Sequence, residues 1–334
     1  MYRIRVECMT TPRQELRFPS AALPLFAILL FLAAGCAASF SPKLLREGTP
    51  SSAGMDLERL QQVDMVIEEA IADRIIPGAV LIVGRQGKIV WNRAYGQRAW
   101  VPVEEPMTLD TIFDMASMTK PIATAASVMR LVERGKMRLQ DRVSVYLPEF
   151  ASAGKAGIRV AQLLTHTSGL APGVPWTTLT RDYGAYCPEA VWWWVVENPP
   201  RIEPDTDFLY SDLNYLTLRM IVERVTGESM AEFAWREIYS PLGMTDTGFY
   251  PSPEHLSRVA PTEQLENELL RGIVHDPMSR LLGGIGGSAG LFSTARDISI
   301  FSQMILNGGV YGGKRIYGPL TLQAMSHDQD RGRG

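Results

Sequence analysis

A serine and a lysine three positions apart form the clearest chemical pattern in this sequence. Ser117 and Lys120 would lie on one face of a helix, because residues i and i+3 are neighbours on a helix surface. A desolvated, neutral lysine there could take the proton of the serine, which gives an activated nucleophile without a histidine. The same spacing recurs at Ser152 and Lys155, so the spacing alone does not identify a site.

The flanking residues distinguish the two copies. Pro121 is tolerated only in the first turn of a helix, and Gly135 suits the end of that helix. Ser117 is therefore predicted at a helix N-terminus, where free N–H groups and the helix dipole favour developing negative charge. Two glycines lie within the run around the second copy, Gly154 and Gly157, which predicts a flexible surface loop in which Ser152 is a cap and Lys155 is solvated.

The chemistry also needs a second group that handles protons. Tyr210 could supply it, because a tyrosine beside an ammonium group can act as a base or a proton shuttle. His166 is the other candidate base. The remaining histidines show no paired metal-ligand spacing, so no metal site and no organic cofactor are predicted.

Several elements must position these groups. In chain order we expect a helix over 56–74, a β-hairpin over 79–94, the helix after Ser117, a mostly helical region over about 125–270, and a helix over 294–307. A strand pair, then helices and then further strands are expected, which predicts an α+β fold with a helical subdomain at about 125–270.

The length and composition of the chain limit the classes of protein to which it can belong. With 334 residues, 46% of them hydrophobic, the chain can bury a substantial core. The net charge is −3 and there is no basic block, which gives nucleic-acid binding no electrostatic support.

The N-terminal segment has the features of an export signal. Two arginines precede an apolar run at 21–34, which is shorter than the roughly 20 residues of a membrane-spanning helix. Residues 32–36 resemble a bacterial lipobox that ends in Cys36. We therefore predict a lipoprotein signal peptide at 1–35, lipidation of Cys36 and a tether at 36–55.

These assignments place the folded domain at 56–334. The protein would be held at the membrane by its lipid, in a bacterial cell envelope, on the periplasmic face or outside the cell. An ordinary secretory signal is the alternative.

Short blocks along the chain occur in the order typical of one family. They lie at 76–80, 117–121, 164–170, 210–212, 241–244 and 290–295 with Asp297, and they cover about 56–325. The chain resembles the serine β-lactamase-like superfamily, in its branch of class C β-lactamases, D-alanyl-D-alanine carboxypeptidases and esterases.

This resemblance implies both a fold and a mechanism. The fold would be β-lactamase/transpeptidase-like, an antiparallel sheet flanked by helices with a mostly helical subdomain. Ser117 would be the acylated nucleophile, Lys120 the base, and Tyr210 the second base and acid. The backbone N–H of Ser117 would be one donor of the oxyanion hole. The substrate would be a small-molecule ester, a D-amino-acid peptide or a β-lactam.

Two departures from the family pattern affect these expectations. Asp212 stands where the second motif usually has asparagine, and an acid there would add negative charge near Lys120, weakening it as a base. The third motif, a Lys/His-Thr/Ser-Gly strand, is not found after residue 290. We therefore expect a C-terminally incomplete domain that lacks its last strands and leaves the hairpin at 79–94 without sheet partners.

Two other interpretations remain. Residues 286–290 match the G-x-S-x-G nucleophile elbow around Ser288, but glycines precede it instead of a buried strand, so we interpret it as a turn at the rim of the site. The alternative function is a non-catalytic, penicillin-binding-like envelope protein that binds peptidoglycan or acts as a scaffold.

Overall fold

The computed structural model describes residues 44–265 and 268–329. The predicted signal peptide, Cys36 and the first part of the tether lie outside the described residues. The remainder of the predicted tether is folded. It contains strand β1 (Arg46–Glu47) and the short helix η1 (Ser51–Ala53), and Leu45 and Ala53 are buried.

The main sheet is built around the predicted hairpin, which the structure confirms. Strand β2 (Gly78–Arg85) pairs antiparallel with β3 (Lys88–Ala99) through a two-residue turn at Gln86 and Gly87. Both turn residues have positive φ, 54° and 75°, as a tight hairpin turn requires. β1 and β4 (Glu105–Pro106) also pair with β3, so the hairpin is not without strand partners.

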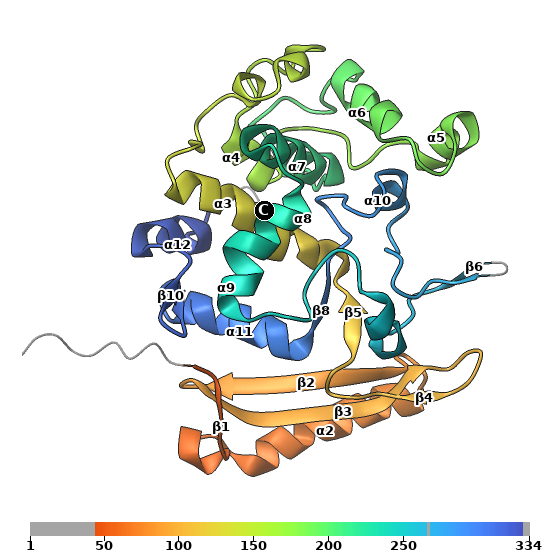
Figure 1. Ribbon diagram of the computed structural model, residues 1–334, viewed down its shortest axis with the longest axis vertical. Helices are drawn as coiled ribbons and strands as arrows, with labels where there is room; N and C mark the ends of the chain where they lie inside the picture. Colours follow the sequence, from red (N-terminus) through yellow and green to blue (C-terminus); the bar gives the residue numbers. More distant parts are fainter. Residues whose placement is uncertain (1–43, 266–267, 330–334) are drawn as a thin grey trace, which may run out of the picture. The chain divides into compact units, whose positions relative to one another are not determined.

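Helices cover both faces of this sheet. Helix α2 (Leu57–Ala72) lies against one face, where the Nε1–H of Trp91 donates to Asp64 at 2.7 Å. Helix α11 (Ala295–Leu306) packs against β2 from the other side (Figure 1). The predicted α+β arrangement of an antiparallel sheet flanked by helices is confirmed, with β1 as a short parallel addition.

The rest of the described chain is mostly helical. The α-helices are α3 (Ala126–Glu133), α4 (Val160–Leu164), α5 (Trp176–Tyr183), α6 (Pro188–Glu197), α7 (Asp212–Thr226), α8 (Met230–Ala234), α9 (Ser240–Leu242), α10 (Pro277–Leu281) and α12 (Pro319–Ser326). Short 3₁₀ or π segments are η4 (Val143–Val145), η5 (Pro148–Ala151), η6 (Trp235–Tyr239) and η7 (Pro253–Arg258). Two small ladders join β6 (Gln264–Leu265) to β7 (Glu268–Leu269) and β9 (Val310–Tyr311) to β10 (Lys314–Arg315).

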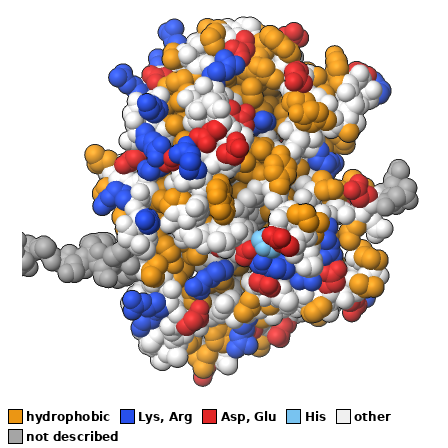
Figure 2. Space-filling model, viewed as in Figure 1, with side chains coloured by type: hydrophobic (Ala, Val, Ile, Leu, Met, Phe, Trp, Pro, Cys, Tyr) orange, Lys and Arg blue, Asp and Glu red, His pale blue; other side chains and the backbone are white. Residues whose placement is uncertain are grey.

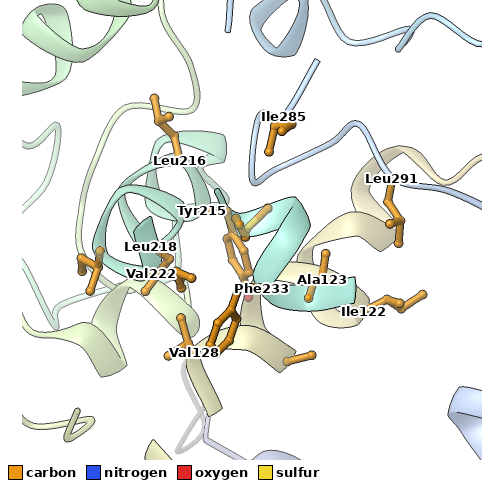
Figure 3. Packing of buried hydrophobic residues seen from close by; sticks show 14 of the residues in the cluster. Ile122, Ala123, Val128, Tyr215, Leu216, Leu218, Val222, Phe233, Ile285 and Leu291 are labelled. Carbon is orange, nitrogen blue, oxygen red and sulfur yellow. The ribbon is translucent and has the colours of Figure 1, made fainter. Parts of the chain in front are cut away.

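The largest core includes the buried faces of α3, α7 and α8. Val128, Leu218, Val222 and Phe233 are nearly inaccessible to solvent and point toward one another (Figure 3). Their burial removes apolar surface from water, at about 25 cal/mol per Å². This core fixes α7, and α7 begins at Asp212 in the predicted site.

A two-stranded ladder connects this helical part to the site. β5 (Ile112–Asp114) pairs antiparallel with β8 (Phe292–Thr294), and Ile112 is 182 positions away from its partner residue Thr294 along the chain. Immediately beyond the ladder, the N–H of Met115 donates to Leu291 O at 2.8 Å. The segments on either side of the ladder, 115–120 and 286–291, are therefore held next to each other.

Candidate active site

Ser117 is presented by a strained turn. It lies in the 3₁₀ segment η2 (Ala116–Met118), directly after β5, and it is exposed. The preceding Ala116 has φ +43°, a region that residues with a Cβ rarely adopt. The carboxylate of Asp114 holds this turn, since Oδ1 accepts the N–H of Ala116 at 2.8 Å and Oδ2 accepts the N–H of His275 at 2.7 Å.

The helix after Ser117 differs from the regular helix predicted. Its first part, η3 (Lys120–Ala125), is a π-helix, which continues as α3 as far as Glu133, and Gly135 follows with φ +65°. Pro121 has no N–H to donate to the preceding turn, and such wide turns are frequent at functional sites. The predicted position of Pro121 and the predicted end of the helix are confirmed.

The structure brings Lys120 and Ser117 together. The side chain of Lys120 is buried, and its Nζ lies 3.0 Å from Ser117 Oγ. Nζ also donates to the carbonyl oxygen of Ser288 at 3.2 Å and forms an ion pair with Asp212 Oδ1 at 2.6 Å. Three oxygen atoms from three distant segments thus surround one amino group.

Tyr210 covers this amino group. The centre of its ring lies 4.8 Å from Lys120 Nζ, and nearly half of the side chain is exposed. Within the residues that the structure describes, the Tyr210 hydroxyl forms no hydrogen bond, so it is free to bind water or a substrate. All four residues predicted for the site, Ser117, Lys120, Tyr210 and Asp212, therefore lie around one point.

His166 organises the segment that carries Tyr210. Its ring lies 4.5 Å from the Tyr210 ring, and its Nδ1 accepts the N–H of Ser211 and contacts Asn214 Nδ2, both at 3.1 Å. Burial, and then the positive charge of Lys120, lower the pKa of His166 to about 4. A neutral His166 is thus an acceptor that positions Ser211, between the two predicted site residues.

Two threonines hold the loop at 286–291 against the site. The Thr124 hydroxyl donates to Gly287 O at 2.6 Å, and Thr119 Oγ1 accepts the N–H of Leu291 at 3.1 Å. Ser288 is buried, and its hydroxyl has no partner among the described residues, so it is not displayed as a nucleophile elbow requires.

Sequence reasoning missed Asp114 and the supporting role of both threonines. Their partners lie about 160 or more residues away along the chain. The one local signal was Asp114 itself, a carboxylate three positions before Ser117.

The interpretation of Lys155 as a solvated lysine in a flexible loop is wrong. Lys155 is fully buried, and its Nζ donates to Val196 O at 2.9 Å and to Asn198 O at 2.7 Å. These carbonyls stand at the C-terminal end of α6, where helices leave acceptors unsatisfied and favour cations. Burial lowers the pKa of Lys155 to about 8. Ser152 also donates to the Val196 carbonyl, so Ser152 and Lys155 together cap the C-terminal end of α6.

Between 44–265 and 268–329, no helix is long and apolar enough to cross a bilayer. The same ranges hold no group of three or more His, Cys, Asp or Glu side chains that could bind a metal ion.

The chain is similar to known proteins over most of its length. The family model described as Beta-lactamase matches residues 63–333. A protein of Escherichia coli K12 named "Putative D-alanyl-D-alanine carboxypeptidase" is 31% identical, over 89% of this chain and 76% of its own length. An N-acetylmuramyl-L-alanine amidase of Bacillus subtilis 168 is 32% identical, over 85% and 70%.

A solved structure also has a similar fold. EstCE1, described as a hydrolase with promiscuous acyltransferase activity, matches with a TM-score of 0.65 and 27% identity, over 80% of this chain and 76% of that chain. Because the family model covers most of the sequence, the chain belongs to the β-lactamase family and is a serine hydrolase.

Proposed function

We propose that Ser117 attacks an ester or amide carbonyl and becomes acylated, in an enzyme anchored to the cell envelope through Cys36. The observation that carries this proposal is the 3.0 Å separation between Ser117 Oγ and the buried Nζ of Lys120. A base within hydrogen-bond reach of a hydroxyl is the arrangement that nucleophilic catalysis requires.

The steps follow from the positions of the groups. Lys120 Nζ first gives a proton to the Asp212 carboxylate, 2.6 Å away, and the neutral amine then accepts the hydroxyl proton while Ser117 Oγ bonds to the carbonyl carbon. The negative charge on the carbonyl oxygen faces the backbone N–H of Ser117, which has no other acceptor among the residues described here. When the bond to the leaving group breaks, the proton passes to that group through Lys120 or Tyr210. Water then attacks the acyl-enzyme by the same route and restores Ser117.

Asp212 and His166 support this chemistry without contacting the carbonyl carbon. The ion pair to Asp212 fixes Nζ, and the hydrogen bond from Ser211 to His166 fixes the segment between Tyr210 and Asp212. A catalytic group held within a few tenths of an ångström gains rate through positioning alone.

The substrate is proposed as a short ester, a D-amino-acid peptide or a β-lactam. Related proteins carry names of carboxypeptidase, amidase and acyltransferase type, all of which act at a carbonyl carbon. Turnover of p-nitrophenyl acetate, diacetyl-L-Lys-D-Ala-D-Ala and nitrocefin by the purified protein tests the proposal. We expect turnover of at least one substrate, lost in Ser117→Ala and retained in Ser152→Ala. Binding of peptidoglycan without turnover of any substrate would instead favour a scaffold.

A further inference from the structure

A cavity of about 390 Å³ lies between α5 and α10, and no step of the proposed mechanism uses it. Its wall includes the aromatic side chains of Trp176, Phe249 and Tyr250, together with Arg280. Hydrophobic side chains gather on the same face of the molecule, over α5 and α6 in the upper right of Figure 2. A volume of this size accommodates an aryl or a branched alkyl group.

The wall of this cavity is joined to the nucleophile turn. Val274 lines the cavity, and the next residue, His275, donates its N–H to Asp114, which holds the turn at Ser117. The three residues from Asp114 to Ser117 span at most about 11 Å. On the other wall, Gly284 precedes the loop whose Ser288 carbonyl accepts from Lys120. Two walls of the cavity are therefore connected to the segments that hold Ser117 and Lys120.

The cavity also has one unmatched positive charge. Arg280 uses Nη1 to donate to Val274 O at 3.2 Å and His275 O at 2.6 Å, and across 44–265 and 268–329 it forms no ion pair. Among the described residues, Asp276 at the N-terminus of the same helix forms no ion pair with Arg280, and its Oδ1 accepts from the N–H and the hydroxyl of Ser279. A guanidinium stays charged at every physiological pH and prefers a carboxylate that accepts two hydrogen bonds.

We propose that this cavity is a substrate subsite that binds an apolar, preferably aromatic group carrying a carboxylate. Trp176, Phe249 and Tyr250 contact the apolar part, and Arg280 pairs with the carboxylate. The inference rests on the proposed role of Ser117, because it names the substrate class of that site. It makes esters or amides with an anionic aryl or alkyl arm the preferred substrates.

Binding of 4-phenylbutyrate and of its neutral amide, followed by ligand-observed NMR, tests this inference without catalysis. We expect the carboxylate to bind at least about tenfold more tightly than the amide, as a charge-assisted pair provides. Arg280→Gln, which keeps donors for the two carbonyls, should abolish this preference, and Arg280→Lys should keep part of it. Ala185→Trp, which fills the cavity from its edge, should weaken both ligands. Equal binding of both ligands by the wild type, or an unchanged preference in Arg280→Gln, would overturn the inference.

Failure of this inference is distinguishable from failure of the proposed function. Labelling of Ser117 by a small fluorophosphonate needs the nucleophile but not the cavity. If Ser117 is labelled but the protein shows no preference for the carboxylate, the proposed subsite is wrong and the proposed nucleophile stands. If the protein prefers the carboxylate but Ser117 is not labelled, the proposed nucleophile is wrong and the proposed binding site stands.

Discussion

Protonation of His166 should destabilise the protein at acidic pH. The buried ring accepts a hydrogen bond from Ser211 at Nδ1, and the nearby amino group of Lys120 disfavours a second positive charge. These effects lower the pKa of His166 from 6.5 to about 4. A proton on Nδ1 would also remove the acceptor that holds the segment between Tyr210 and Asp212.

The size and sign of the effect follow from this shift. As pH falls below 6.5 the unfolded chain binds a proton at this histidine, while the folded chain does not do so until about pH 4. The contribution to stability is therefore complete above pH 6.5, declines as pH falls, and is lost once the pH is below the folded pKa. A shift of this size corresponds to about 3 kcal/mol.

Urea unfolding at pH 7, 6, 5 and 4 measures this contribution. The matched control is His166→Asn, because the asparagine Oδ1 can take the place of Nδ1 as an acceptor, does not titrate, and tolerates the positive φ of 58° at this position. Between pH 7 and pH 4 the wild type should lose about 3 kcal/mol more than the variant. Parallel stability curves for the two proteins would refute the assignment of His166 as a buried neutral acceptor.

Three further substitutions test separate parts of the account. Asp114→Ala removes the acceptors that hold the Ser117 turn and should slow fluorophosphonate labelling of Ser117 by about 10- to 100-fold, with a smaller loss in Asp114→Asn. Equal labelling rates in the wild type and Asp114→Ala would contradict the positioning role of Asp114. Gly290→Ala should lower the free energy of unfolding by more than about 3 kcal/mol, because φ is +115° and the added Cβ would lie 1.9 Å from a carbonyl oxygen. The control Gly243→Ala, with φ +74° and open space around the Cβ, should cost only about 1 kcal/mol in thermal melts. Lys155→Met leaves two buried carbonyls without this donor and should lower the free energy of unfolding by about 2 kcal/mol, while the labelling of Ser117 stays unchanged. Loss of labelling would show that Lys155 acts on the site.

Local spacing predicted the parts of the fold and the site that depend on neighbours in sequence. The hairpin follows from two apolar runs joined by a glycine-bearing turn, and its register is set by that turn. The contact between Ser117 and Lys120 follows from an i, i+3 spacing, which survives the change from an α-helix to a 3₁₀ and π segment. β1 could not be predicted, because a two-residue strand has no periodicity.

Partners that are distant in sequence account for the rest. The glycines around Lys155 suggested exposure, but burial is decided by the end of α6, about 40 residues further along the chain. In the sequence, Asp114 cannot be distinguished from other loop carboxylates, because its role depends on the N–H groups of Ala116 and His275 that the fold places beside it. Such networks depend on tertiary packing, which no local pattern encodes.

The central claim is that Ser117 becomes covalently modified during the reaction. Peptide mapping by mass spectrometry, after reaction of the intact protein with a fluorophosphonate, tests it most directly. We expect one adduct, on Ser117, that disappears in Ser117→Ala and persists in Ser152→Ala and Ser288→Ala. An adduct on another residue, or one that is undiminished in Ser117→Ala, would contradict it.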